Sequence, residues 1–383
     1  MGGIYYVRNI LKTLSHAQWM HNNSIHLFCP SEHLDIFKSL SNEFPKFTIH
    51  IRPPRGGRWH KILDRRLGPV IGKFDADLIR ITRNQTITHI FPIQDFPYAG
   101  VRATQVHWIP DFQHFKLPEC FPASERNHRS RVFHRALNSK RPTLVSSQNA
   151  KAHLQEFHPN HRSPVFVVPF ISDIEDEIRQ LTPDREFEIL SRHGLSTEGR
   201  VKQFLYIPNQ FWKHKNHILV VKALAELRSN GAVMPHVVCT GSMSDHRGNS
   251  HITELAQLIQ ANSLSNHFQT LGFVNRLDQI AIMKSCHGLI QPSLFEGWNT
   301  GVQEAKRLGR HLLLSDIPIH REQNDGTATF FAPDDHRQLA RSMLALLARP
   351  SSITRDVDLL HLQQASATKY AEGAKGLFSH LDC

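Results

Sequence analysis

The most informative run of the chain is SLFEGWNTGVQEAK, residues Ser293–Lys306, which follows an apolar run over residues 287–291. The apolar run predicts a buried strand, and the proline, serine and glycine residues after it are typical of a loop. Asn299 or Thr300 can cap a helix that follows this loop. The inward-facing positions of that helix are apolar: Val302, Ala305 and Leu308. The sequence therefore predicts a strand, a tight loop and a helix start in direct succession.

Two carboxylates, Glu296 and Glu304, lie eight positions apart in this run. Backbone N–H groups at a helix start and the positive end of the helix dipole suit a pyrophosphate group. Glu304 lies one turn into the helix and offers two acceptor oxygens that match the vicinal hydroxyls of a ribose. Glu296 would then face the group beyond the phosphates. Further candidate binding residues lie between the two acids: Gly297, Asn299, Thr300 and Gly301.

The same run resembles the Glu, seven residues, Glu signature of retaining glycosyltransferases of the GT-B class, in particular glycosyltransferase family four (glycosyl transferases group 1). Further segments resemble this family in the same order over nearly the whole chain. The resemblance implies that Glu296 holds the sugar of a nucleotide-diphosphate sugar donor and that Glu304 holds its ribose. It also implies an α/β GT-B fold of two Rossmann-like domains that face each other across a cleft, with no metal and no cofactor.

Length and composition agree with a two-domain globular protein. The 383 residues exceed what one hydrophobic core usually serves, and 40% hydrophobic with 21% charged residues is ordinary globular composition. No apolar run approaches the roughly 18 residues of a membrane span, and no secretory leader is visible. Five cysteines are scattered and form no CxxC pair, which favours neither a disulfide framework nor a zinc ribbon. We therefore expect a cytoplasmic protein.

The formal net charge of +11 favours an anionic partner. One basic cluster, Arg52–Arg66, is interleaved with proline, glycine and Trp59 and predicts a mobile loop. Such a loop would suit an acceptor that carries phosphate, or peripheral association with the inner face of a membrane. A second cluster, Arg126–Arg141, follows a predicted helix and is interpreted as a solvated charged face. No nucleic-acid-binding motif is visible, so we expect no nucleic-acid partner.

Apolar runs and amphipathic stretches alternate along the chain, which is typical of parallel sheets covered by helices. The predicted strands are 24–29, 47–51, 88–92, 105–109, 143–146, 165–168, 204–208, 236–240, 287–291 and 311–315. The predicted helices are 7–14, 74–82, 124–137, 150–157, 217–228, 252–261, 277–284 and 300–308. We expect an N-terminal acceptor-side domain over 1–172, a linker over 173–200 and a nucleotide-sugar-binding domain over 201–350. The resemblance also implies a last helix, about 359–381, that packs back on the N-terminal domain.

The start of the chain resembles the glycine-rich loop and first helix of the family's N-terminal domain. In that family a β-strand precedes the glycines, whereas here Gly2 and Gly3 directly follow the first residue. We therefore expect the first strand of the N-terminal sheet to be missing. Gly2 and Gly3 are candidate contacts to phosphate or acceptor, because glycine lets a backbone come close to a ligand; a flexible terminus without a role is the alternative.

A predicted strand and a predicted helix flank a basic segment that contains Lys213 and Lys215. At this place the family has an arginine and a later lysine, whose charges neutralise the departing diphosphate of the donor. Lys215 matches the lysine. The arginine position holds Gln210, so one of the two charges is absent or is supplied by Lys213.

Two further segments follow predicted strands and can line a donor pocket. The first contains Gly241, and the second is the run Leu271–Val274. The second run resembles the family's turn in which the backbone of the last residue pairs with the nucleotide base, which gives this role to Val274. As the alternative, Gly272 simply serves a turn.

The N-terminal half carries an Asp and a His after a predicted strand, at Asp111 and His114. Related enzymes place acceptor-side polar groups there, and a His and an Asp three residues apart can share a proton or orient an acceptor hydroxyl. A metal site formed by His107, Asp111 and His114 is the less favoured alternative by ligand type. The run Ser146–Gln148 is expected to cap a helix.

The sequence thus predicts a metal-independent hexosyltransferase that moves a hexose from a nucleotide-diphosphate sugar to an acceptor hydroxyl with retention of anomeric configuration. Its catalytic residues are predicted to be Glu296, Lys215, Asp111 and His114. Its acceptor is expected to be a sugar, polysaccharide or glycolipid, in cell-surface polysaccharide or glycolipid synthesis. The alternatives are a non-catalytic sugar-nucleotide-binding protein and a nucleotide-sugar hydrolase or epimerase on the same fold.

Overall fold

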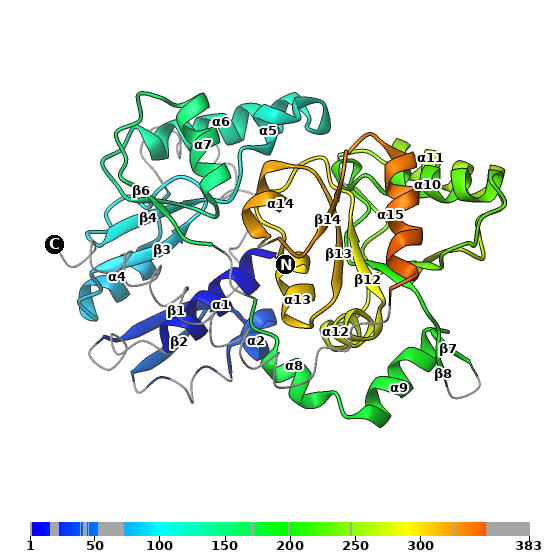
Figure 1. Cartoon of the computed structure of the whole chain (residues 1–383). Coiled ribbons are helices and arrows are strands. Elements are labelled where there is room, and N and C mark those ends of the chain that lie inside the picture. The colour runs from blue at the N-terminus through cyan, green and yellow to red at the C-terminus, as the bar shows by residue number, and fades with distance from the viewer. Residues whose placement is uncertain are drawn as a thin grey trace. The chain divides into compact units, whose positions relative to one another are not determined.

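Figure 1 shows the computed structural model of the chain. The structure describes residues 2–15, 23–38, 40, 44, 46–52, 73–169, 172–197, 200–245, 247–324 and 326–349. The chain divides between Ile171 and Ser172 into two compact units, which we call unit 1 and unit 2. The predicted basic loop beyond Arg52 and the predicted helix 359–381 lie outside the described residues.

Unit 1 contains two parallel sheets. The larger sheet has the order β3 (His89–Ile93), β4 (Thr104–Ile109), β5 (Thr143–Val145), β6 (Val165–Val167), and the smaller one pairs β1 (Ile25–Pro30) with β2 (Phe47–Arg52). The α-helices are α1 (Gly2–Ser15), α2 (Leu34–Lys38), α4 (Ala76–Asn84), α5 (Gln113–Lys116), α6 (Ala123–Leu137) and α7 (Gln148–Phe157). Within the described part of unit 1, no strand joins the smaller sheet to the larger one.

Helix α1 packs on the larger sheet through aromatic contacts. The ring of Tyr6 stacks on Trp108 of β4 at a centroid distance of 4.3 Å, and its hydroxyl donates to the carbonyl oxygen of Val168 at 3.2 Å. A Cβ added to Gly3 would lie 3.5 Å from the Trp108 ring. Gly2 and Gly3 form the first turn of α1, so the glycine-rich loop expected from the resemblance is helical here.

Unit 2 contains one six-stranded parallel sheet with the order β11-β10-β9-β12-β13-β14. Its strands are β9 (Leu205–Ile207), β10 (Val237–Cys239), β11 (Phe268–Thr270), β12 (Gly288–Gln291), β13 (His311–Ser315) and β14 (Thr329–Phe331). Successive strands are added on one side from β9 to β11 and on the other side from β12 to β14. The order therefore reverses between β9 and β12, and ligands of open α/β sheets bind at the carboxyl ends of strands at such a switch point.

Helices cover both faces of this sheet, because alternate strand residues point to opposite sides. Leu205 and Ile207 of β9 belong to one buried cluster with α10 (His217–Ser229), α11 (Ser250–Ala261) and α15 (His336–Leu347). Phe204 and Tyr206 belong to a second cluster, with α12 (Arg276–Ser285) and α13 (Thr300–Arg307). A short helix, α14 (Pro318–Gln323), follows β13.

The stretch 173–200, expected to be a linker, is largely helical and packs in unit 2. It contains α8 (Glu175–Gln180), α9 (Pro183–Arg192) and the short strand β7 (Ser196–Thr197), which pairs with β8 (Arg200–Val201). Five of its apolar residues are buried in the second cluster of unit 2: Ile174, Leu181, Ile189, Leu190 and Leu195. The low apolar content suggested a linker, but these residues suffice to bury one side of α9.

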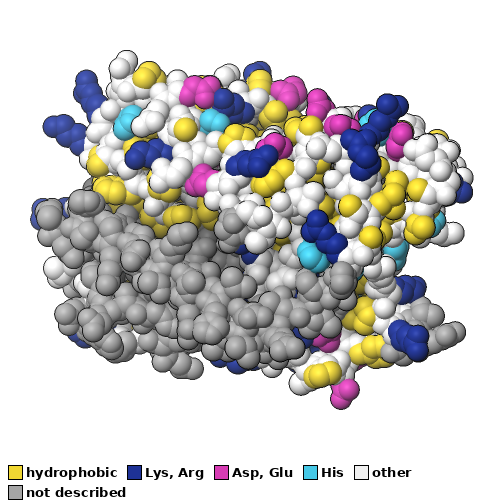
Figure 2. Space-filling model, viewed as in Figure 1, with side chains coloured by type: hydrophobic (Ala, Val, Ile, Leu, Met, Phe, Trp, Pro, Cys, Tyr) yellow, Lys and Arg dark blue, Asp and Glu magenta, His cyan; other side chains and the backbone are white. Residues whose placement is uncertain are grey.

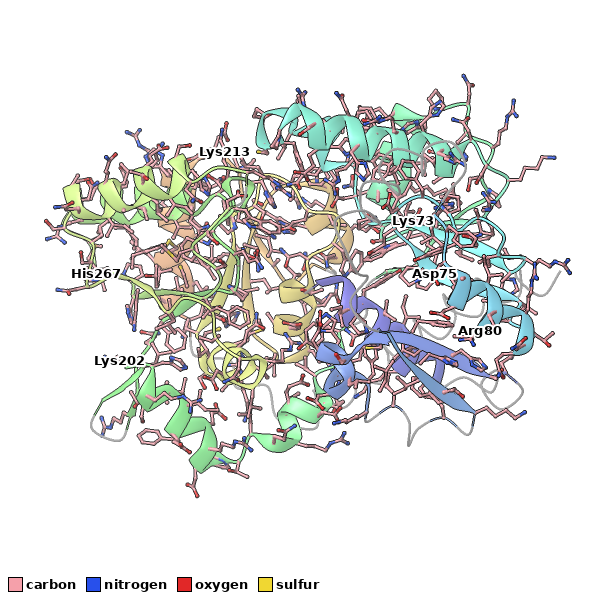
Figure 3. The ribbon with its side chains drawn as sticks, turned by 180° about the vertical axis from the view of Figure 1, so that it is seen from behind. Lys73, Asp75, Arg80, Lys202, Lys213 and His267 are labelled. Carbon is pink, nitrogen blue, oxygen red and sulfur yellow. The ribbon has the colours of Figure 1, made fainter. Side chains whose placement is uncertain are left out.

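The strands and helices predicted within the described ranges all form, with shifted ends. Helices α2, α5, α14 and α15 and strands β11 and β14 are among the elements for which the prediction gave no range. Local signals explain several helix starts: Asp75, labelled in Figure 3, accepts a hydrogen bond from the Leu78 amide at 2.9 Å and so caps α4. Ser147 does the same for α7 through the Ala150 amide, at 2.9 Å, as expected for the run Ser146–Gln148.

The surface carries mixed charges. On the face shown in Figure 2, Lys and Arg side chains are interspersed with Asp and Glu side chains over the described residues. Among the helices that the structure describes, none has the length and apolar character that a membrane crossing requires.

Candidate active site

The switch point of unit 2 brings a cation and an anion together. Lys215 lies in a short 3-10 helix (Lys213–Lys215) after β9, and Glu296 lies in the loop after β12. The Lys215 Nζ donates to Glu296 Oε1 at 2.6 Å, and the two side chains are 14% and 7% exposed. A short, largely buried pair of this kind is much less screened by water than a surface pair. The two residues predicted to be catalytic in unit 2 are therefore in direct contact.

Two further side chains fix the carboxylate of Glu296. Ser293 Oγ donates to Oε1 at 2.7 Å, and Asn299 Nδ2 lies 3.3 Å from the same oxygen. All the hydrogen bonds that the described residues give to this carboxylate reach Oε1. Hydrogen bonds to an ionised acceptor are stronger than neutral ones, so the orientation of Glu296 is well defined and Oε2 faces a different direction.

Asn299 also begins helix α13, as one of the two predicted caps. Its Oδ1 accepts from the Val302 amide at 3.3 Å. The next turn packs directly on the strand ends: a Cβ added to Gly301 would lie 2.9 Å from Gln291 Nε2 and 3.2 Å from Pro208 Cγ. Glycine at this position therefore lets the N-terminus of α13 sit close to the ends of β9 and β12. This is the helix start predicted to face a pyrophosphate.

His320 contacts the side chain of Asn299. The sequence analysis did not single out this histidine. Its Nδ1 lies 2.9 Å from the carbonyl oxygen of Ser315, and its Nε2 lies 3.3 Å from Asn299 Nδ2. Burial lowers the pKa of His320, which favours a neutral ring whose Nδ1–H donates to Ser315 and whose Nε2 accepts from Asn299. Nearby, Asp316 pairs with Arg321 at 2.7 Å, which fixes the loop after β13.

Glu304, one turn into α13, is held by residues distant in sequence. Arg276 Nη2 donates to Glu304 Oε1 at 2.7 Å, and Ser172 Oγ donates to the same oxygen at 3.2 Å. The Nε of Arg276 lies 3.6 Å from Glu177 Oε1, and Glu177 Oε2 is buried with no hydrogen-bond partner among the described residues. Arg276 thus lies between two acids. Its position two residues after the run Leu271–Val274 was the only sequence signal that pointed to it.

The loops after β9, β10 and β11 contact one another. Gly241 has φ +133°, and an added Cβ would lie 2.3 Å from the carbonyl oxygen of Asn209. Its amide donates to the carbonyl oxygen of Gly272 at 2.8 Å. Val274 is partly exposed. Gly241 is therefore required by a close backbone approach beside the switch point.

The two other predicted diphosphate contacts are exposed. Gln210 follows β9, and Lys213 lies on the same 3-10 helix as Lys215. Figure 3 labels Lys213. Lys215 therefore differs from Lys213 in its burial and in its carboxylate partner. The roles of Gln210 and Lys213 stay predictions.

In unit 1, Asp111 and His114 follow β4 but do not form the expected pair. Asp111 Oδ1 accepts from the Gln113 amide at 2.9 Å and lies 3.7 Å from Arg129 Nη2. His114 is 3% exposed, and neither ring nitrogen has a hydrogen-bond partner within the described ranges. Its ring instead packs against Phe115 and Phe133, at centroid distances of 4.2 and 5.1 Å.

Burial, and secondarily the Arg129 charge, lower the pKa of His114 to about 4, so the ring is neutral at pH 7. The expected proton sharing with Asp111 is therefore not found, because aromatic packing rather than a carboxylate holds the imidazole. The less favoured metal site is not supported either: among the described residues, no three His, Cys, Asp or Glu side chains form a group that could hold a metal ion.

The fold of the chain resembles that of known enzymes. HepE from Anabaena in complex with UDP-glucose matches 97% of this chain and 96% of its own, with a TM-score of 0.64 and 13% identity. A glycosyltransferase from Rickettsia africae ESF-5 matches 97% and 89%, with a TM-score of 0.59 and 15% identity. WaaG, a glycosyltransferase involved in lipopolysaccharide biosynthesis, matches 97% and 90%, with a TM-score of 0.57 and 13% identity. The chain therefore has the GT-B glycosyltransferase fold, as predicted.

The family described as Glycosyl transferases group 1 matches residues 193–357. This stretch contains Lys215, Glu296 and Glu304, and it is a glycosyl transferases group 1 domain, as the resemblance implied. A search of curated proteins found no match to the chain.

Proposed function

We propose that the protein is a retaining, metal-independent glycosyltransferase that moves a hexose from a nucleotide-diphosphate sugar to an acceptor hydroxyl. The observation that carries the proposal is the buried Lys215–Glu296 pair beside the N-terminus of α13, at the switch point of the sheet. A cation and helix amides aimed at one place suit a leaving diphosphate. The HepE structure, which contains UDP-glucose, supports this donor class by analogy of fold.

The proposed contact of Glu296 with the donor follows from which of its carboxylate oxygens is already hydrogen-bonded. Lys215, Ser293 and Asn299 bind Oε1 of Glu296, so Oε2 is the atom we assign to a sugar hydroxyl. As the glycosidic bond breaks, negative charge grows on the diphosphate and Lys215 exchanges part of its interaction with Glu296 for the phosphate oxygens. The acceptor hydroxyl attacks from the same face, and its proton passes to the departing phosphate. No protein nucleophile is required in this proposal.

Glu304 is assigned to the ribose hydroxyls, but Arg276 and Ser172 occupy its Oε1 in this structure. A ribose that uses both oxygens of Glu304 must displace Arg276. Glu177 offers Arg276 a second partner, because its Oε1 is 3.6 Å away and its buried Oε2 has no partner within the described residues. We infer that Arg276 moves from Glu304 toward Glu177 when the donor binds.

The acceptor side is assigned to unit 1, where the N-terminus of α1 and the residues after β4 and β5 lie at the carboxyl ends of the strands. Asp111 is the proposed acceptor-orienting carboxylate. His114 is proposed as a neutral group near the acceptor, because its lowered pKa does not allow it to act as a cation. Cell-surface polysaccharide or glycolipid synthesis is the proposed pathway class.

A panel of nucleotide sugars tests the proposal through thermal shift and sugar transfer, since a ligand that binds the folded state raises the melting temperature. We expect one class of donor to raise the melting temperature and to support transfer. Glu296→Gln should depress turnover more than donor binding, and Glu304→Ala should weaken donor binding. Unchanged kinetics in both variants would remove the assignment.

A non-catalytic sugar-nucleotide-binding protein is the second candidate. The observation that favours it is Gln210, an exposed neutral residue where the resemblance implies an arginine. Donor binding without transfer or hydrolysis under any acceptor condition would support this candidate, and hydrolysis without acceptor would favour a hydrolase.

A further inference from the structure

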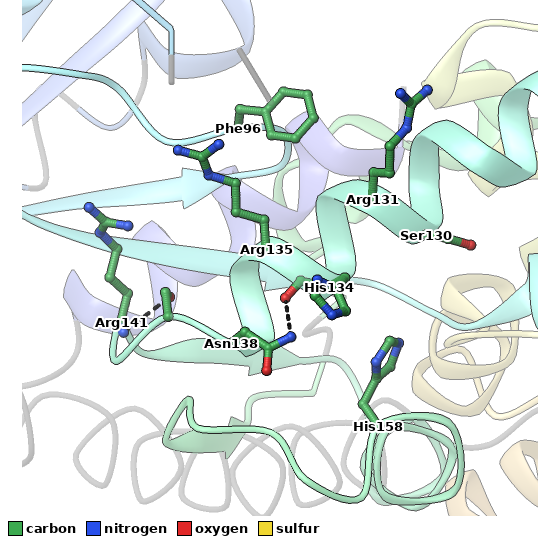
Figure 4. Close-up of a pocket in the computed structure, with 9 residues that line it drawn as sticks. Phe96, Ser130, Arg131, His134, Arg135, Asn138, Arg141 and His158 are labelled. Atoms are coloured by element: carbon green, nitrogen blue, oxygen red, sulfur yellow. Dashed lines mark hydrogen bonds between the residues drawn. The ribbon is translucent and has the colours of Figure 1, made fainter. Parts of the chain in front are cut away.

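Unit 1 contains an open pocket of about 790 Å³ that no step of the proposed reaction uses. Figure 4 shows the residues that line it. They are Phe96, Ser130, Arg131, His134, Arg135, Asn138, Ser139, Arg141 and His158. Most come from the last turns of α6 and from the turn that follows this helix.

The pocket lies away from the residues proposed to bind the acceptor. Helix α6 begins after β4 and ends before β5, so its last turn lies toward the amino ends of the strands. Asn138, Ser139 and Arg141 directly precede β5, and His158 directly follows α7, before β6. Asp111 lies at the opposite, carboxyl end of β4. The fifteen-residue helix separates the two ends by about 22 Å at 1.5 Å per residue.

The lining is strongly cationic. Its charge comes from three arginines, and none of its nine residues carries a carboxylate. Arg131, His134, Arg135 and Asn138 are spaced at i, i+3, i+4 and i+7, which places them on one face of α6. Within the described part of the chain, neither Arg131 nor Arg141 forms an ion pair. Like charges gathered around one concavity repel one another, and a bound anion relieves that repulsion.

The second basic cluster of the sequence therefore divides into two groups. Arg129 approaches Asp111 at 3.7 Å and lies over the Phe121 ring at 5.1 Å, so it is occupied within the fold. Arg131, Arg135 and Arg141 instead surround the pocket, where Arg135 lies 6.0 Å from the centroid of Phe96. A uniformly solvated face, as expected from sequence, would not be hollowed in this way.

Stabilisation of the helix end does not require Arg131 or Arg141. Basic residues near a helix C-terminus often bind its last carbonyl groups. Here other side chains do so: Asn138 Nδ2 donates to the His134 carbonyl oxygen at 2.9 Å, and Ser139 Oγ donates to that of Ala136 at 2.6 Å. Arg131 Nε donates to the Asn127 carbonyl oxygen at 3.2 Å, one turn earlier in α6, so the helix end does not take up the charges of Arg131 and Arg141.

We propose that this pocket binds a phosphate-bearing ligand at a site separate from the sugar donor. Planar guanidinium groups match the geometry of phosphate oxygens, and Arg binds phosphate in a two-pronged manner. The same chemistry is offered by a phosphorylated sugar in solution and by a phospholipid headgroup in a bilayer. Phe96 provides an apolar surface that the part of the ligand next to the phosphate can contact.

Titration calorimetry with inorganic phosphate tests the shared chemistry. The variants are Arg131→Gln/Arg141→Gln and the matched control Arg102→Gln/Arg162→Gln, which removes two exposed arginines of unit 1 outside the pocket. A third variant, Lys215→Ala, tests whether the measured phosphate binds at the donor site, because binding there should weaken when Lys215 is removed. We expect the pocket variant to lose at least about tenfold in phosphate affinity, while the control and Lys215→Ala keep this binding. Equal phosphate affinity in the pocket variant and the wild type would overturn the proposal.

Vesicle co-sedimentation then separates the two sources. Vesicles of phosphatidylcholine alone are compared with vesicles that also contain phosphatidic acid. If the protein binds the vesicles with phosphatidic acid, and the pocket variant loses this binding while the control keeps it, the ligand is a lipid headgroup. If the protein binds phosphate but not vesicles, the ligand is a soluble phosphorylated molecule. Melting temperatures close to the wild-type value show that the pocket variant is folded. Loss of sugar transfer with intact phosphate binding would count against the proposed function and not against this site.

Discussion

In unit 2 the candidate residues Lys215 and Glu296 are held by a charge pair, whereas in unit 1 the candidate His114 is held by packing. Lys215 and Glu296 form a buried ion pair that two more donors support. His114 is equally buried, but aromatic rings surround it and its nitrogens have no partner within the described residues. The difference indicates that charge orients the unit 2 residues, while aromatic packing orients a neutral imidazole in unit 1.

The largest effect is expected for Lys215→Ala. The variant loses the cation proposed to stabilise the diphosphate, so kcat/KM for transfer should fall by roughly 10²–10³. It also leaves Glu296 buried without its partner, which should cost about 3–5 kcal/mol of stability. Initial-rate kinetics and thermal unfolding measure the two effects.

Lys213→Ala is the matched control, because it removes an exposed lysine two residues away on the same 3-10 helix. This variant should keep kcat/KM for transfer and the stability of the protein close to the wild-type values. Equal losses in the two variants would show that burial and pairing do not set the role of Lys215, and the contrast between the units would lose its basis.

The next effect concerns the close packing of the unit 2 loops. Gly241→Ala forces a Cβ toward the Asn209 carbonyl oxygen, 2.3 Å away, at a φ of +133°. We expect a loss of about 3 kcal/mol or more in the free energy of unfolding. Gly231→Ala is the control, since Gly231 has φ +63° and no heavy atom within 4 Å of an added Cβ. Its loss should be about 1–2 kcal/mol, measured by urea unfolding; similar losses at the two sites would argue against the tight loop contact.

The pH dependence of the free energy of unfolding tests whether the imidazole of His114 in unit 1 is held neutral. The pKa of His114 is lowered by burial to about 4 in the folded protein, against 6.5 for an unperturbed histidine. Between these values the unfolded chain binds more protons, so stability falls as pH drops from 6.5 toward 4 and is unaffected by His114 above that window. His114→Leu should reduce the loss between pH 7.5 and pH 4.5 by about 2.5 kcal/mol.

Urea unfolding at the two pH values measures this difference. His107 and His217, whose pKa values burial also lowers, to about 4 and about 3, contribute equally to both proteins and cancel. An unchanged pH dependence in His114→Leu would mean that the imidazole is not held neutral by its surroundings.

The smallest effect is expected for Arg276→Ala. The variant removes the competitor for Glu304 Oε1, so donor KM should fall by about threefold to tenfold with little change in kcat. Arg192→Ala is the control, because Arg192 pairs with Asp278 at 2.6 Å in the same unit but outside the site. A higher KM in Arg276→Ala would indicate that Arg276 binds the donor directly rather than giving way to it.

Local sequence patterns predicted much of the fold, and the structure brings together two of the candidate site residues. The strand, loop and helix around Ser293–Lys306 form as predicted, because strand, turn and cap signals act within a few residues. Lys215 was predicted from its match to the lysine of the family that the chain resembles, and its role stays a prediction. The partners of Glu304 could not, since Arg276 and Ser172 reach it from 28 and 132 positions away and only the tertiary fold brings them together.

The errors have the same origin. The spacing of Asp111 and His114 suggested a hydrogen-bonded pair. Instead, the imidazole ring of His114 packs against neighbouring phenylalanine rings. The stretch 173–200 looked like a linker because its apolar residues are few, and only the three-dimensional arrangement shows that they meet the second cluster of unit 2.

If Glu304 binds a ribose as proposed, its hydrogen bond with Ser172 connects donor binding to the first residue of unit 2. Ser172 is the first residue of unit 2, at the point where the chain arrives from unit 1. Its hydroxyl is anchored only 3.2 Å from the oxygen that a ribose would take over, and its carbonyl oxygen accepts from Arg307 Nη1 at 3.4 Å. A ligand that takes over Glu304 Oε1 would therefore remove one of these two bonds and leave Ser172 held by Arg307 alone among the described residues.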